Sequence, residues 1–342
     1  MGKFGWFLIA LLLVPNLIAK TVVLPELTAP EEIRIEGNKI FVVEGIQVFI
    51  YSLKDFAFIA KFGRVGEGPK EFLRSSAPWL PSIFLYTTPQ HLFINSMNKI
   101  SLFSHKGEFQ REDKPQSKRG MFPFVPVGKN HIRFDGVNES NVAYYALILM
   151  DSQYKKIKEI FRFKAHQQNG KKLDPIVMST IKDWFYRHIH KDILYFPTLD
   201  GVIHVFDSTG QETLTIKPPY QPIPITKSLA KKYEDHFLAD IRFKMIYKAD
   251  RARIEYGTHL PPMQAYAIDS NKIYIITPHK ISKGHKTFIY SIKGKLLKTI
   301  HLPLKLQDIL TIYPFTIHNN TIYQLTETED EECQLTTTPI KG

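Results

Sequence analysis

A group of cationic and aromatic side chains late in the chain has the chemistry to hold an anion. Lys248, Arg251 and Arg253 lie close together and are flanked by Tyr247 and Tyr256. A guanidinium pairs with carboxylate or phosphate through two parallel hydrogen bonds, and an aromatic ring can stack on it. The group therefore predicts Lys248, Arg251, Arg253 and Tyr256 as ligand-binding residues. The alternative interpretation is a solvated helix face.

Two histidines could bind a metal ion. His188 and His190 alternate as metal ligands on a strand often do, and Asp192 follows them. No third ligand is identifiable, so the sequence assigns no metal and no cofactor. Nucleophilic catalysis has no support either, because the chain has no Gly-x-Ser-x-Gly elbow and its one cysteine, Cys333, has no His beside it. No catalytic residue is assigned.

A glycine-rich string stands between residues 62 and 72. Its backbone amides could surround an anion. The string lacks the Lys-Ser/Thr ending of a phosphate loop, and no βαβ unit surrounds it. Glycine permits a positive φ and proline fixes a turn, which favours a structural junction between successive sheets. The residues of this predicted junction are Gly63, Gly66, Gly68, Pro69 and Phe72.

A short recurring unit predicts the elements that position these residues. Alternating apolar residues lead to an aromatic residue, then to Ser or Asp, then to a turn with Gly and Lys; the clear copies start at residues 100, 203 and 288, and looser ones at 48 and 147. Alternation with a tight polar turn is typical of a hairpin. Hairpins that recur about every 50 residues indicate propeller blades. We expect Phe103, Phe206 and Tyr290, which occupy equivalent places, to pack between blades.

A second unit gives the number of blades. A polar pair precedes an apolar strand six times, at residues 38–43, 90–94, 130–134, 191–196, 271–276 and 320–323. Six copies predict an all-β fold, a six-bladed β-propeller with four strands in each blade. Because such rings close with a strand from the chain start, residues 21–24 are expected to complete the last blade.

Two stretches interrupt the repeats and predict helical insertions. The first lies near 173–190, where Asp174-Pro175 is typical of a helix start. The second lies near 226–256, where Leu229, Tyr233 and Phe237 recur every four residues. Both helices are expected over one mouth of the ring, since loops and insertions often carry function.

The glycine string also carries a family resemblance. FGRVGEGPKEF at 62–72 resembles the G-x-x-G-x-G-P-x-E-F junction of NHL-like six-bladed β-propellers, and residues 260–274 are similar to the same group. The resemblance covers roughly residues 30–340. It implies a six-bladed propeller within a group of exported bacterial proteins of largely unassigned function. Many of those relatives are lipoproteins, whereas this chain has no cysteine near the expected cleavage point.

The start of the chain predicts export. Lys3 precedes an apolar run, and Pro15 and Ala19 follow it, which is the anatomy of a signal peptide over 1–19. Residues 20–342 would then form a single propeller domain with no membrane span, in the periplasm or at the cell surface. Lys and Arg number 45 against 33 Asp and Glu, a net charge of +12. Such a surface attracts anionic partners, and export makes nucleic acid an unsuitable one.

These observations favour a non-catalytic binding or scaffold module. Its ligand, of unidentified but anionic chemistry, would lie at the channel mouth near the helical insertion. The expected partners are a protein or an anionic glycan or lipid. The alternative is a metal-dependent hydrolase or lactonase, because lactonases on this fold use Glu, Asn and Asp side chains in the channel. Glu44, Asn95 and Asp269 are the candidates for that role.

Overall fold

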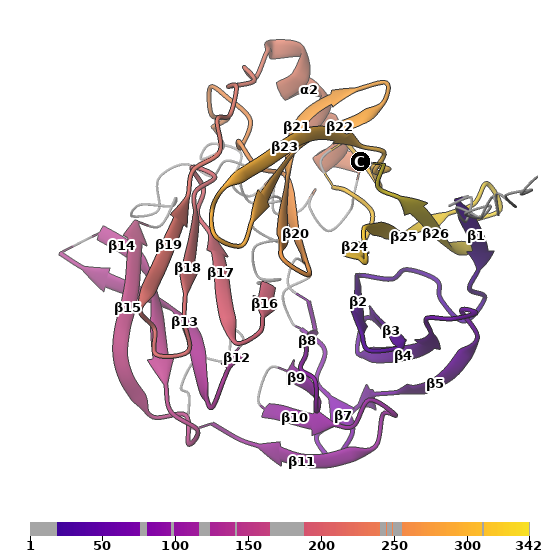
Figure 1. The fold of residues 1–342 in the computed structure, drawn as a ribbon, viewed down its shortest axis with the longest axis vertical. Coiled ribbons are helices and arrows are strands. Elements are labelled where there is room, and N and C mark those ends of the chain that lie inside the picture. The colour runs from indigo at the N-terminus through magenta and orange to yellow at the C-terminus, as the bar shows by residue number, and fades with distance from the viewer. Residues whose placement is uncertain are drawn as a thin grey trace, which may run out of the picture.

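Six antiparallel sheets of four strands each surround a common axis in the computed structural model of the chain (Figure 1). The structure describes residues 19–75, 81–96, 99–115, 124–140, 142–164, 188–239, 244, 248, 255–309 and 311–341. Each sheet is one blade, with its strands in order from the inside of the ring outward. The six-bladed β-propeller predicted from the repeats is confirmed.

Each of the first five blades uses four consecutive strands. Blades 1 to 3 are β2 (Glu32–Glu36), β3 (Lys39–Glu44), β4 (Gln47–Ser52), β5 (Phe58–Phe62); β8 (Ile83–Thr87), β9 (Leu92–Ser96), β10 (Lys99–Phe103), β11 (Phe109–Asp113); and β12 (Phe124–Val127), β13 (Asn130–Glu139), β14 (Val142–Met150), β15 (Lys156–Lys164). Blades 4 and 5 are β16 (His188–His190), β17 (Ile193–Pro197), β18 (Ile203–Phe206), β19 (Glu212–Ile216); and β20 (Ala265–Asp269), β21 (Lys272–Ile281), β22 (Gly284–Ser291), β23 (Leu296–Leu302). All six predicted apolar strands are the second strands of blades.

The last blade joins the two ends of the described chain. It consists of β24 (Phe315–His318), β25 (Thr321–Glu327), β26 (Cys333–Pro339) and β1 (Lys20–Val23). β1 pairs antiparallel with β26, so that Val22 lies opposite Leu335. The predicted closing strand is therefore present. Closure of the ring leaves no blade without neighbours on both faces.

The recurring hairpin unit forms the turn between the third and fourth strands. In blade 4, Asp207 accepts hydrogen bonds from the amides of Thr209 and Gln211 at 2.8 and 3.0 Å, and Gly210 has a φ of +73°. A side chain at Gly210 would meet Ile160 of the preceding blade. Local hydrogen bonding and close packing thus explain why Ser or Asp recurs with Gly in this turn.

The aromatic residues of the repeat pack between blades as expected. Phe103 and Phe206 are fully buried, and Tyr290 is 6% exposed. Phe103 stacks on Phe62 of blade 1 at 4.3 Å between ring centroids, and Phe206 lies 5.8 Å from Phe161 of blade 3. Tyr290 shares a core with Tyr195 of blade 4. The hydrophobic core is therefore distributed over the blade interfaces.

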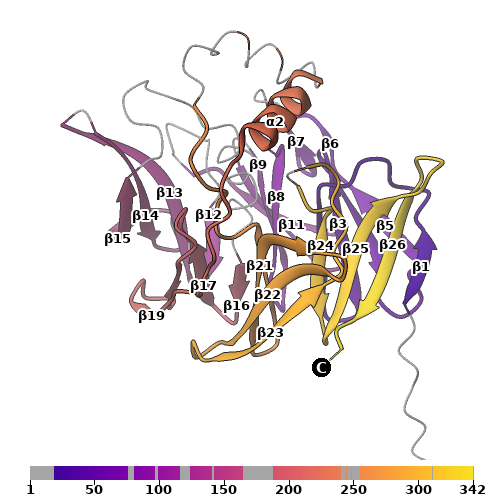
Figure 2. The same ribbon diagram turned by 90° about the horizontal axis from the view of Figure 1, so that it is seen from above.

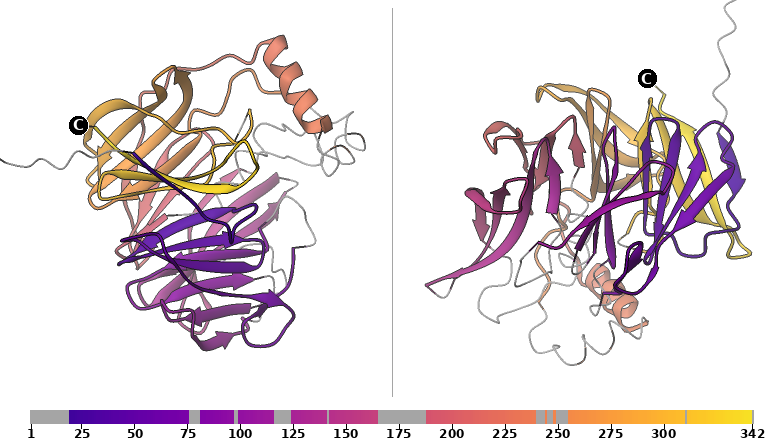
Figure 3. Two further views of the ribbon diagram at one scale, coloured as in Figure 1. Left: turned by 90° about the vertical axis from the view of Figure 1, so that its right-hand side faces the viewer. Right: turned by 90° about the horizontal axis from the view of Figure 1, so that it is seen from below.

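The long connections gather on one face of the ring. Antiparallel order places the second-to-third-strand turns and the blade-to-blade connections at the same end of every blade. α2 (Lys227–Ala239) lies on this face in the connection between blades 4 and 5, while the C-terminus lies on the opposite face (Figures 2 and 3). We call the face that carries α2 and the blade-to-blade connections the loop face. No helix in the described ranges has the length and apolarity needed to cross a membrane.

α2 confirms part of the insertion predicted over 226–256. Thr226 caps the helix, because its hydroxyl oxygen accepts a hydrogen bond from the Leu229 amide at 3.2 Å. Tyr233 and Phe237 are the buried residues of the helix. Of residues 240–254 the structure describes only Lys244 and Lys248. The insertion predicted near 173–190 lies mostly outside the described residues. Its end was placed wrongly, because residues 188–190 form the inner strand β16, which pairs with β17.

Candidate functional site

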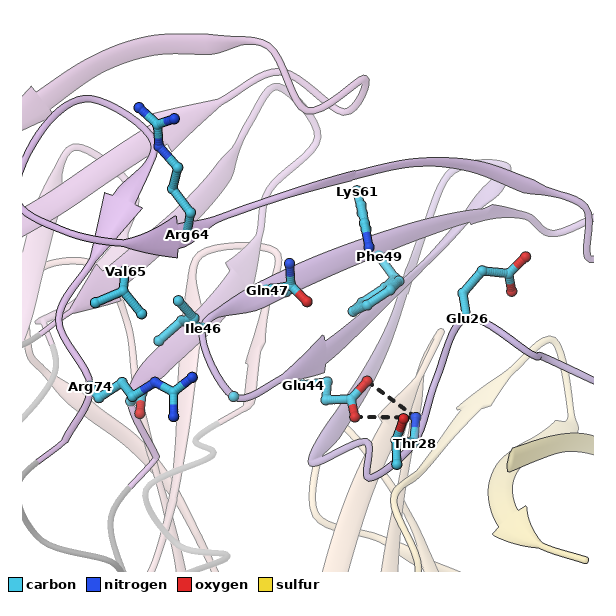
Figure 4. Close-up of a pocket in the computed structure, with 12 residues that line it drawn as sticks. Glu26, Thr28, Glu44, Ile46, Gln47, Phe49, Lys61, Arg64, Val65 and Arg74 are labelled. Atoms are coloured by element: carbon cyan, nitrogen blue, oxygen red, sulfur yellow. Dashed lines mark hydrogen bonds between the residues drawn. The ribbon is translucent and has the colours of Figure 1, made fainter. Parts of the chain in front are cut away.

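A groove of about 590 Å³ opens on the loop face over blade 1 (Figure 4). Three segments border it: the connection from blade 6 to blade 1, the turn between β3 and β4, and the connection from blade 1 to blade 2. Its lining residues are Glu26, Thr28, Glu44, Gly45, Ile46, Gln47, Phe49, Lys61, Arg64, Val65, Arg74 and Ser82. The volume is within the range typical of small-molecule sites.

Three cations line the groove. Arg64 is held by Glu71 at 2.7 Å, yet its side chain is 78% exposed. The ammonium of Lys61 lies 5.6 Å from the centroid of the Phe49 ring. Arg74 is exposed, and no ion pair to it is found among the described residues. Figure 4 shows Arg64 and Arg74 at one end of the groove and Lys61 over its middle.

Carboxylates occupy the other end. Glu44 accepts hydrogen bonds from the amides of Thr28 and Ala29 at 3.1 and 2.7 Å, which ties the incoming connection to the β3–β4 turn. Glu26 is exposed and accepts a hydrogen bond from the Tyr51 hydroxyl at 3.3 Å. Burial, together with the nearby carboxylates of Glu44 and Glu327, raises the pKa of the Cys333 thiol to about 12. This thiol therefore stays protonated at neutral pH.

The glycine string forms the wall beside the cations. β6 (Arg64–Val65) and β7 (Glu71–Phe72) pair in parallel within it, and the Glu71 carboxylate accepts the Gly68 amide at 2.8 Å. The carbonyls of Glu67 and Gly68 accept hydrogen bonds from the ammonium of Lys99, at 3.2 and 2.7 Å. The loop thus turns two carbonyls toward a buried cation, which is the opposite polarity to a phosphate loop. Gly63, Gly66, Gly68, Pro69 and Phe72 lie at the boundary of blades 1 and 2, where the junction was predicted.

Glu44, Asn95 and Asp269 each bond backbone groups rather than one another. Asn95 bonds both the amide and the carbonyl of Phe124 in the next blade, at 2.9 and 2.7 Å. Asp269 accepts the amides of Asn319 and Asn320 at 3.1 and 2.9 Å. All three side chains therefore tie neighbouring segments together, which is a structural use of polar groups.

An ion pair occupies the inner strand of blade 1. Arg34 donates to Glu32 at 2.5 Å, and its guanidinium lies 5.9 Å from the centroid of the Tyr86 ring in blade 2. Burial raises the pKa of Glu32, and Arg34 opposes that shift. The pair links two adjacent inner strands, and it was not predicted from the sequence.

Of the two histidines considered as metal ligands, the structure describes the side chain of His190 only. His190 ends β16, and its pKa is lowered by burial and by Lys191. Asp192 is exposed in the following turn with a φ of +60°. Among the described residues no group of three or more His, Cys, Asp or Glu side chains could hold a metal ion.

Half of the predicted ligand-binding group on the insertion can be located. Lys248 is helical and exposed, whereas Arg251 and Arg253 lie outside the described residues. Tyr256 is half-buried and packs against the small core that Tyr233 and Phe237 form under α2. The role of these four residues in binding stays a prediction.

The groove was not predicted from the sequence because its charged residues are far apart in the chain. All of blade 1 lies between Glu26 and Arg74 in the chain, and only the folded ring brings the two residues to one surface. A partial signal was present, since Arg64 lies within the glycine string and Arg74 follows it closely.

The geometry described so far defines a six-bladed β-propeller with a charged groove on its loop face. Residues 25–199 match DUF5128, a family described as a 6-bladed beta-propeller, and the chain belongs to this family. Among curated proteins, no sequence matches the chain.

Solved structures with a similar chain path are distant in sequence. The Pan2 WD40 domain of Neurospora crassa is 7% identical with a TM-score of 0.43, and the match covers 94% of this chain and 95% of that one. The computationally designed Ika8 protein is 8% identical with a TM-score of 0.38, over 90% and 96% of the two chains. KlHsv2 with loop 6CD replaced by a Gly-Ser linker is 10% identical with a TM-score of 0.35, over 91% and 86%. Likenesses this distant carry no argument about function.

Proposed function

We propose that the protein is an exported, non-catalytic binding propeller that takes a ligand with an anionic group on its loop face. The observation that carries this proposal is the groove over blade 1, where Lys61, Arg64 and Arg74 line one cavity. Arg64 and Arg74 present guanidinium groups to solvent, and such groups bind carboxylate or phosphate oxygens in pairs.

The surroundings of the groove support binding. The ion pair with Glu71 already restrains the Arg64 side chain, so Arg64 loses less conformational entropy when a ligand binds. The floor contains Ile46 and Phe49, both buried, and the exposed Val65. An apolar floor with a few charged groups at the rim is typical of a ligand site. Lys248 belongs to the same connection as α2 and would add positive charge to this face, whereas Arg251 and Arg253 stay a prediction from the sequence.

Export and the kind of ligand are part of the proposal. The apolar run after Lys3 supports a cleaved signal peptide, and the net charge of +12 supports an anionic glycan, lipid or protein partner. The resemblance to NHL-like propellers rests on residues 62–72 and 260–274. No observation in the described residues favours the alternative hydrolase, because Glu44, Asn95 and Asp269 bond backbone groups.

The proposal is tested by removing charge from the groove. Parent protein and the Arg64→Gln/Arg74→Gln variant are titrated at low salt with oligogalacturonate, with phosphatidylglycerol vesicles and with N-acetyl-Ala-Leu-Ala. We expect saturable binding of at least one probe, weakened about tenfold in the variant and by added salt. Lys106→Gln, on the opposite face, is the matched control. Absence of binding to all three probes, or equal binding by the variant, would overturn the proposal.

A further inference from the structure

The groove over blade 1 is bipolar. Arg64 and Arg74 belong to the connection that leaves blade 1, and Glu26 belongs to the connection that enters it. Glu44, in the β3–β4 turn, lies on the side of Glu26, because it bonds the amides of Thr28 and Ala29. Figure 4 shows the same separation, with the two arginines at one end and Glu26 at the other.

The opposite charges do not neutralise each other. Arg64 pairs with Glu71 outside the groove, and no ion pair within the described part of the chain joins Arg64 or Arg74 to Glu26 or Glu44. Charges that could approach would pair at contact distance. The fold therefore holds them apart over an apolar floor of Ile46, Phe49 and Val65.

The two carboxylates have different roles. Both oxygens of Glu44 lie within 3.3 Å of the Thr28 amide, and one also accepts from Ala29, so this side chain is fixed in place. Glu26 is exposed and has one long hydrogen bond, from Tyr51. Glu327 extends the negative region, since it pairs with Cys333 across β25 and β26, and the Cys333 carbonyl accepts the Leu24 amide of the incoming connection. Glu26 is thus the residue able to contact a cation, and Glu44 and Glu327 add to its attraction.

We infer that the ligand of this groove is a zwitterion with an apolar body, the chemistry of a short peptide with free termini. Its carboxylate contacts Arg64 and Arg74, its ammonium contacts Glu26, and its side chains cover Phe49 and Val65. This inference rests on the proposed function, which requires only the anionic end.

Three forms of one peptide test the inference by calorimetry at low salt. Ala-Leu-Ala carries both charges, N-acetyl-Ala-Leu-Ala carries only the carboxylate, and Ala-Leu-Ala amide carries only the ammonium. We expect the free peptide to bind at least about threefold more tightly than either blocked form. Glu26→Gln should lower the affinity for the free peptide to that for the N-acetyl form and leave the N-acetyl affinity unchanged. Glu108→Gln, an exposed acid on the opposite face, is the control and should change neither.

The outcomes separate the two proposals. Equal affinity for the free and N-acetyl peptides overturns the zwitterion and leaves an anion-binding groove. Binding of oligogalacturonate or vesicles through Arg64 and Arg74, with no binding of the free peptide, also overturns the zwitterion and leaves an anion-binding groove. A free-peptide preference that survives Glu26→Gln also overturns the inference, because the ammonium would then be bound elsewhere.

Discussion

Replacement of Lys99 by methionine should destabilise the propeller strongly. The Lys99 side chain is fully buried, and its ammonium donates to the Glu67 and Gly68 carbonyls and to Glu112 at 2.8 Å. Methionine has a similar length but no donor, so two carbonyls and a carboxylate lose their partner. Loss of one member of a buried pair costs about 3–5 kcal/mol. Because Glu112 is 20% exposed and also has Lys114 at 3.5 Å, we expect the lower end, about 3 kcal/mol.

Chemical and thermal unfolding measure this loss. For a chain of this size, with an unfolding entropy of about 2.1 cal/mol/K per residue, about 3 kcal/mol corresponds to a fall in Tm of roughly 4 °C. The double variant Lys99→Met/Glu112→Leu should recover part of the loss, since no unpaired carboxylate remains. A fall in unfolding free energy below about 0.5 kcal/mol in Lys99→Met would refute the reasoning, because that is the range of ordinary surface changes.

The same pair predicts a pH dependence. Hydrogen bonding to Lys99 lowers the pKa of Glu112 from its ordinary value of 4.5, despite some desolvation. A depressed folded-state pKa adds stability that is complete above the unfolded-state pKa and is lost as pH falls through the folded-state value. Parent protein should therefore lose this contribution below about pH 4.5, and Lys99→Met should show a flatter profile there.

Three further predictions concern the fold and its export. Gly63→Ala should cost more than about 2 kcal/mol, because φ is +102° and the new Cβ would lie 2.2 Å from the Ile46 carbonyl oxygen; Gly136→Ala, with open space around it, is the control in the same unfolding assay. Phe206→Ala should cost about 3–5 kcal/mol, whereas truncation of the 41% exposed Phe58 should cost far less, and equal melting curves for the two would contradict the blade packing. N-terminal sequencing of protein from its native host should find a start near Lys20, and an intact Met1 on membrane-bound material would exclude cleavage.

Most of the fold could be predicted from local patterns in the sequence. The alternation of apolar residues, the Ser or Asp before each tight turn and the glycine with positive φ act within a few residues of one another. Asp207 and Gly210 illustrate this, since the turn that they form is closed by hydrogen bonds to its own amides. Repetition of such a unit defines a blade, and its six copies define the ring. Even the closing strand β1 could be anticipated, because a propeller ends by pairing its first and last segments.

The candidate site was decided by tertiary structure. Glu44, Asn95 and Asp269 were read as potential channel ligands, and only their contacts show that they bond backbone amides of neighbouring segments. The glycine string could be recognised as a junction from the sequence. That its carbonyls bind a cation depends on the Lys99 ammonium, which belongs to blade 2. The groove needs Glu26 and Arg74 on one surface, although blade 1 separates them in the chain. Contacts between residues distant in sequence have no local periodicity, so they take shape only when the blades pack around the ring.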